Sequence, residues 1–145
     1  MDNRTMTLTR TFRADPATVY GAWTDPAVLP KWFGPEGFHC VTHDIDLREG
    51  GHWLFDMIGH GMTFANRHRY LRLVPHSVIE FLMDDGDDQA EPMVVTVTFA
   101  AEGAGTLLTH QVRFPSAEAY DAAKGYNAEA MGYTTLAKLA AELGE

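Results

Sequence analysis

Between residues 38 and 114, apolar side chains recur at every second position, and this alternation constrains the fold more than any other feature of the sequence. A period of two is typical of strands with one buried face. Short segments rich in glycine, proline or acidic residues interrupt it and favour turns. The pattern predicts a meandering antiparallel sheet, with six strands over residues 38–47, 52–58, 64–73, 78–83, 93–99 and 107–114.

The segment before this region predicts one strand and two short helices. Residues 5–13 alternate in the same way. Asp15-Pro16 has the pattern of a helix start, an N-cap followed by a proline in the first turn. Asp25-Pro26 repeats that pattern. Pro30 should limit the second helix to one or two tight turns, because proline removes a backbone donor and crowds the preceding turn.

The carboxy-terminal part changes to a helical period. The alanine-rich residues 119–143 predict one long helix with Ser116 as its N-cap. Gly125 and Gly132 lie inside it, and each should have a packing reason, because an internal glycine costs about 1 kcal/mol relative to alanine. This helix is the only predicted element long enough to cover one face of the sheet. The sequence therefore predicts an α+β fold in one domain over residues 1–145.

Composition argues against several classes of protein. The net charge of −9 disfavours nucleic-acid binding, which needs clustered lysine and arginine. No apolar run is long enough to span a membrane, and the amino terminus has no pattern of a secretory signal. A single cysteine, Cys40, excludes an intramolecular disulfide and agrees with a cytoplasmic location. We expect no metal and no other cofactor, since no metal-ligand spacing is present. A homodimer is a common state for such chains.

Several longer motifs follow one another along nearly the whole chain. They are DPATVYGAWTDPAVLPKWFGP, DLREGGHW, VTVTFAAEGAGTLLT and MGYTTLAKLAAEL. In this order they resemble the SRPBCC or START-like superfamily, and within it the branch named after activators of the ATPase of the 90-kDa heat-shock chaperone. Tyr133 departs from the family, which usually has tryptophan there. The resemblance implies a helix-grip fold, in which a curved sheet wraps around the long helix.

The resemblance also implies an internal cavity that binds a hydrophobic or amphipathic small molecule between the sheet and the long helix. The strand pattern alone favours a filled core, because most buried aromatic residues only pack. Trp32, Phe33 and Phe38 are expected at the entrance of the cavity. The full set expected to contact a ligand is Trp32, Phe33, Phe38, Trp53, Phe55, Met57, Phe64, Tyr70, Phe81, Met83, Val97, His110, Phe114 and Met131.

His110 is the most interesting polar candidate, because it shares a strand face with apolar residues. A buried imidazole can orient a ligand or transfer a proton near pH 7, and the alternative is a core histidine satisfied by the protein. His68 and Tyr70 lie on one face of a strand whose direction the weak alternation leaves open. If that face points inward, the three residues form a polar cluster.

Two other functions stay open beside ligand binding. The first is a cyclase- or dehydratase-type enzyme that uses His110 and Tyr70, with His68 as a further catalytic candidate. The second is a chaperone-associated protein-interaction module that presents Trp32 and Phe33 as an exposed aromatic patch.

Overall fold

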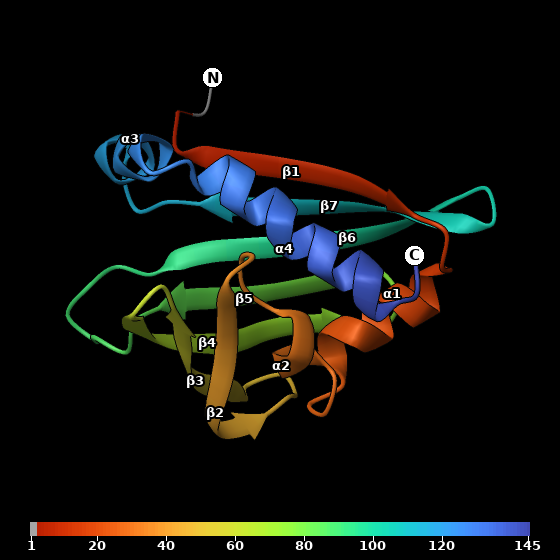
Figure 1. Cartoon of the computed structure of the whole chain (residues 1–145), viewed down its shortest axis with the longest axis horizontal. Coiled ribbons are helices and arrows are strands. Elements are labelled where there is room, and N and C mark those ends of the chain that lie inside the picture. Colours follow the sequence, from red (N-terminus) through yellow and green to blue (C-terminus); the bar gives the residue numbers. More distant parts are fainter. Residues whose placement is uncertain (1–2) are drawn as a thin grey trace.

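The computed structural model describes residues 3–145 and contains one antiparallel sheet of seven strands (Figure 1). The order across the sheet is β1-β7-β6-β5-β4-β3-β2, so the first strand pairs with the last and the others follow as a meander. The predicted antiparallel meander is confirmed. The strands are β1 (Thr5–Phe12), β2 (Phe38–Asp46), β3 (His52–Gly59), β4 (Met62–Val74), β5 (Val78–Asp84), β6 (Met93–Glu102) and β7 (Gly105–Arg113).

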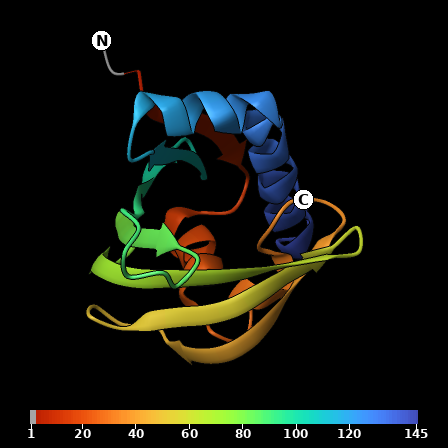
Figure 2. The same cartoon turned by 90° about the vertical axis from the view of Figure 1, so that its left-hand side faces the viewer.

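Four helices accompany the sheet: α1 (Pro16–Thr24), α2 (Leu29–Trp32), α3 (Ala117–Gly125) and α4 (Ala128–Glu142). Figure 1 shows α4 crossing one face of the sheet, with α1 and α2 at the end of the molecule where α4 finishes. Figure 2 shows that the sheet is strongly curved, so that β2 and β3 lie opposite α3. This is the helix-grip arrangement expected from the resemblance. No helix within residues 3–145 has the length and apolar character needed to cross a membrane.

Two helices begin where the sequence predicts. The Asp15 carboxylate accepts a hydrogen bond from the Thr18 N–H (2.9 Å), and Pro16 occupies the first turn of α1. The Ser116 hydroxyl accepts from the Ala119 N–H (3.1 Å) at the start of α3. In both cases a side-chain oxygen satisfies a backbone donor that has no partner within the helix.

The second short helix begins later than the sequence predicts. Asp25 ends α1 instead of starting α2, because its N–H donates to the Gly21 carbonyl (2.9 Å). The helix α2 starts at Leu29, so Pro30 lies in its first turn, where a missing N–H disturbs no helical bond. The proline therefore helps to start this four-residue helix.

The prediction of one continuous helix over residues 119–143 is wrong. The chain breaks after Gly125, and Asn127 adopts a left-handed conformation (φ 62°), which asparagine tolerates better than most residues. Figure 2 shows that α3 and α4 run in different directions. Gly132 does have the expected packing reason, because a Cβ there would clash with the Leu8 side chain of β1. Gly125 has no such neighbour within 4 Å and marks the end of α3.

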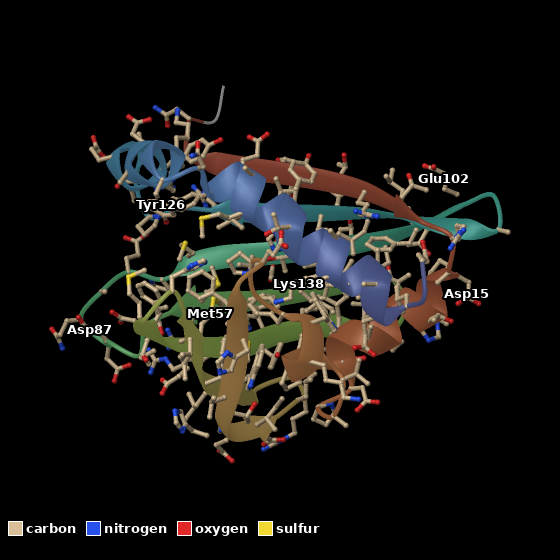
Figure 3. The ribbon with its side chains drawn as sticks, viewed as in Figure 1. Asp15, Met57, Asp87, Glu102, Tyr126 and Lys138 are labelled. Carbon is tan, nitrogen blue, oxygen red and sulfur yellow. The ribbon has the colours of Figure 1, made fainter. Side chains whose placement is uncertain are left out.

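The segment between α2 and β2 is tied to α4. The Lys138 ammonium donates to the carbonyls of Gly34 and Phe38, each at 3.0 Å, and the Thr134 hydroxyl accepts from the Glu36 N–H at 3.0 Å. Figure 3 shows Lys138 at the middle of α4. These bonds hold α2 and the following loop against the helix, which closes this end of the core.

Candidate functional site

A pocket of about 170 Å³ lies between α4 and the strands β1, β5, β6 and β7. Its most exposed lining residue is Tyr126, which is 60% exposed, so the pocket opens to solvent beside this side chain. Figure 3 shows Tyr126 at the junction of α3 and α4. The mouth therefore lies at the break that divides the two helices.

The two walls of the pocket differ in side-chain size. The sheet wall consists of large apolar or aromatic residues and one imidazole: Met6, Phe81, Met83, Met93, His110, Val112 and Phe114. Trp23 and Phe33 close the inner end. The α4 wall presents Ala128, Gly132 and Thr135 at helical spacing, with Leu136 beside them. Small residues on the helix leave the space that makes the pocket.

Two ring nitrogens in the lining are buried and have no hydrogen-bond partner among residues 3–145. They are Nε1 of Trp23 and Nδ1 of His110. The two rings lie side by side, with centroids 6.0 Å apart and planes inclined by 29°. A buried polar atom without a partner costs free energy. Two neighbouring residues of the apolar lining therefore each have a polar atom that is unsatisfied within residues 3–145.

Burial keeps the two inner histidines uncharged. It lowers the pKa of His110 to about 4. Burial and, to a smaller extent, nearby His110 lower the pKa of His68 to about 3, and Asp84 opposes this shift. At neutral pH each imidazole therefore carries one N–H and one acceptor nitrogen.

His68 and Tyr70 face inward, which decides the direction that the sequence left open. Both are almost completely buried. The His68 ring lies 4.3 Å from the ring of Phe81 and 5.1 Å from that of Phe55, and Phe33 and Trp53 also contact it. Neither His68 nor Tyr70 lines the pocket. The expected cluster of His68, Tyr70 and His110 is therefore not formed around the pocket, and burial raises the pKa of Tyr70 far above its usual value.

The structure brings five of the fourteen expected ligand contacts together at the pocket: Phe33, Phe81, Met83, His110 and Phe114. The others lie elsewhere. Trp53, Phe55, Tyr70 and Val97 fill the core beside it, and Met57 and Met131 are half-buried outside the lining. A filled core and a pocket thus exist side by side under one sheet.

Three aromatic residues do not lie where the sequence predicted them, at the entrance of the cavity or on its wall. Trp32 is buried, because its indole N–H donates to the Ala22 carbonyl (3.0 Å) beneath α1. Phe64 points inward by strand parity, yet it is 47% exposed, and its ring lies 6.1 Å from that of Phe38 between centroids. Phe38 is half-buried and contacts His60 and Phe64 away from the pocket.

The exposed aromatic patch of the interaction hypothesis does not exist. Trp32 is 1% exposed and Phe33 8% exposed, because α2 folds into the core. The chaperone-associated alternative loses the surface on which it was based.

Sequence reasoning missed much of the lining. Met6, Met93 and Val112 alternate in phase with buried strand residues, so their inward direction could have been read from the pattern. The position of Trp23 at the pocket follows only from how α1 packs. Tyr126 and Ala128 reach the mouth because the helix breaks between them, and no sequence signal pointed to this break as a site.

Outside the pocket, Nε2 of His68 and Nε of Arg69 are also buried without a partner in residues 3–145, whereas His43 and Cys40 have structural partners. No group of three histidine, cysteine or acidic side chains gathers to hold a metal ion there. His43 pairs with Asp56 (3.0 Å between Nε2 and Oδ2) on the exposed side of β2 and β3. Burial raises the pKa of the Cys40 thiol to about 11, and the thiol donates to the Phe33 carbonyl (3.3 Å). Cys40 is thus a protonated structural thiol at neutral pH.

Comparison with known proteins agrees with this architecture. A family model described as Activator of Hsp90 ATPase homolog 1-like protein matches residues 13–144. A protein of Chromobacterium violaceum is 33% identical, with a TM-score of 0.80, and the alignment covers 94% of this chain and 95% of that chain. A protein of Mycobacterium smegmatis is 25% identical, with a TM-score of 0.87 and coverage of 98% and 92%.

A third solved structure, the AHSA1 protein of Silicibacter pomeroyi, is 25% identical and has a TM-score of 0.73. The alignment covers 97% of this chain and 97% of that chain. No curated protein matches the chain. The curved antiparallel sheet with its carboxy-terminal helix defines a helix-grip protein. More narrowly, the chain belongs to the family of Activator of Hsp90 ATPase homolog 1-like proteins.

Proposed function

We propose that this protein binds a small apolar or amphipathic molecule in the pocket between α4 and the sheet. One observation carries the proposal: two residues that line an apolar pocket open to solvent, Trp23 and His110, each have a buried ring nitrogen without a partner in the described part of the chain. Apolar ligand surface buried there would contribute about 25 cal/mol per Å² before the costs of association. The ring nitrogens would orient the polar end of the ligand.

The volume limits the size of the ligand. Sites for drug-sized molecules measure roughly 300–1,000 Å³, whereas an engineered apolar cavity of about 150 Å³ binds benzene. The pocket of about 170 Å³ therefore fits a molecule of about one aromatic ring. Met6, Met83 and Met93 lie in its wall, and changes in their flexible side chains can adapt it to other shapes.

Binding has more support than proton-transfer chemistry. An enzyme that uses His110 and Tyr70 needs both groups within reach of one substrate. Tyr70 is buried against Phe81 (5.8 Å between ring centroids) and does not line the pocket. His110 has no hydrogen bond to a second titratable side chain within residues 3–145. These facts favour a role of His110 in positioning a ligand.

The proposal is tested by filling the mouth of the pocket. Ala128 lines the pocket at the first turn of α4 and is half-buried, so Ala128→Trp should fill it without entering the strand core. Ala137 lies on the exposed side of the same helix, and Ala137→Trp is the matched control. Circular dichroism and thermal unfolding would show whether each variant is folded.

Benzene binding, followed by NMR titration, is the readout. Wild type and Ala137→Trp should bind benzene with equal affinity, and Ala128→Trp should bind it at least tenfold more weakly. Wild-type protein that binds no benzene, or a folded Ala128→Trp variant with unchanged affinity, would rule out the pocket as the binding site.

A further inference from the structure

The three tryptophans of the chain differ in how their indole N–H groups are satisfied. Trp32 donates to the Ala22 carbonyl at 3.0 Å, and Trp53 donates to the Thr42 hydroxyl at 3.0 Å. Trp23 has no acceptor within residues 3–145, although its Nε1 is buried. It is also the tryptophan that lines the pocket. An indole nitrogen can only donate, so an acceptor atom is what Trp23 lacks.

The second unsatisfied group is on the neighbouring ring. His110 lies on β7, and its Nδ1 is buried without a partner. The ring is uncharged at neutral pH, because burial lowers its pKa to about 4. The neighbouring core histidine, His68, is also uncharged, and the charge of Asp84 acts on His68. A neutral imidazole nitrogen can accept from a hydroxyl or donate to a carbonyl, depending on the tautomer.

The rest of the lining offers no charge. None of the lining residues in the described part of the chain is acidic, lysine or arginine. The Thr135 hydroxyl donates to the Met131 carbonyl (3.4 Å) and is satisfied within α4. A carboxylate or ammonium group would therefore be buried with no opposite charge, which is strongly unfavourable. An uncharged ligand oxygen avoids this penalty.

We infer that the pocket selects neutral one-ring molecules that carry a hydroxyl or carbonyl oxygen, and that Trp23 and His110 are the residues that recognise this oxygen. The inference rests on the proposed function and adds the class of ligand to it. The Trp23 N–H donates to the oxygen, and a hydroxyl on the ligand can in turn donate to His110. The apolar walls hold the ring.

The test compares three ligands of similar size: phenol, toluene and benzoate. Phenol has the neutral oxygen, toluene replaces it with a methyl group, and benzoate carries a charge. Wild-type protein should bind phenol at least tenfold more tightly than toluene and at least tenfold more tightly than benzoate. In the proton–nitrogen NMR spectrum, the indole N–H signal of Trp23 should move downfield with phenol but not with toluene. That signal is assigned as the one lost in Trp23→Phe.

Substitutions connect the preference to the two residues. Trp23→Phe and His110→Phe should each reduce the ratio of phenol to toluene affinity to near one. Trp53→Phe is the matched control, because its N–H already donates to Thr42, and it should keep the wild-type ratio. The spectrum of the wild type tests the same point without any variant, so a misfolded substitution leaves the inference testable.

Two failures are distinguishable. If phenol and toluene bind wild type equally well, and Ala128→Trp weakens both, the pocket binds ligands but the inference is wrong. If phenol, toluene and benzene all fail to bind wild type, the proposed function and the inference are both wrong. Equal movement of the Trp23 signal with phenol and toluene would also overturn the recognition of an oxygen.

Discussion

The concave side of the sheet has a filled half and a hollow half, and each contains one histidine: His68 is buried and His110 is half-buried. In the filled half, aromatic rings contact His68 on several sides, and His68 does not line the pocket. In the hollow half, His110 lies on the wall of a pocket of about 170 Å³. Both halves are built from alternating strands with large apolar side chains, so the sheet does not explain the difference.

The covering elements explain it. The filled half lies under Phe33, whose ring contacts both Trp53 (5.5 Å between centroids) and Phe55 (6.0 Å). The hollow half lies under Ala128, Gly132 and Thr135 of α4. The small side chains of Ala128 and Thr135 leave space in front of the sheet, whereas Gly132 lets α4 pack closely on Leu8 of β1. The break before α4 leaves the mouth open. The residues of the covering helix, and not those of the sheet, thus decide where this core is hollow. We therefore expect substitutions in the two halves to change the free energy of unfolding by different amounts.

The largest expected difference between the two halves is in the stability lost when a large side chain is truncated to alanine. Trp53 is fully buried, and Trp53→Ala should lower the free energy of unfolding by about 3–5 kcal/mol, because it creates a new cavity and removes the bond to Thr42. Met93 is half-buried beside existing space, so Met93→Ala should cost less than about 2 kcal/mol. Urea unfolding measures both values. Equal losses would contradict the division into filled and hollow halves.

The two histidines should make the fold sensitive to mild acid. Burial lowers the pKa of His68 to about 3 and that of His110 to about 4, whereas both titrate near 6.5 when unfolded. The unfolded chain therefore binds more protons below pH 6.5, and stability is lost as the pH falls from there toward the folded pKa values. Between pH 7 and pH 5 each histidine should cost about 2 kcal/mol.

Urea unfolding at both pH values measures this loss, and His68→Phe should roughly halve it. Asp84 does not contribute in this range, because its hydrogen bonds with Arg67 lower its pKa below 3.8, so its contribution is lost only in stronger acid. A loss that stays the same in both His68→Phe and His110→Phe would show that the buried histidines are not its source.

The smallest expected difference in stability is between alanine substitutions at two glycines of the carboxy-terminal region. Gly132→Ala should destabilise the protein by about 1–3 kcal/mol, because the new methyl group would clash with Leu8 and push α4 from β1. Gly125 has no neighbour within 4 Å, so Gly125→Ala should be neutral or stabilising by up to about 1 kcal/mol. Thermal unfolding compares them. Similar effects at both positions would argue against close packing of α4 on β1.

Much of the architecture could be predicted because it depends on local chemistry. Alternation predicted the strands, and the caps at Asp15 and Ser116 predicted two helix starts. The errors arose where neighbours decide. Pro30 was assigned to the middle of a helix, because the pattern could not show that Asp25 ends α1. The break at Asn127 was missed, because an alanine-rich pattern continues across it.

By itself, the sequence determined the order of elements, the antiparallel meander and the inward direction of His110, since these follow from periodicity and backbone preference. The tertiary structure alone decided which inward residues fill the core and which line a pocket. Space between a sheet and a helix depends on the sizes of side chains that are distant in the chain. Ala128 and Thr135 leave room beside His110 and Trp23, and no local pattern at any of these residues contains that information.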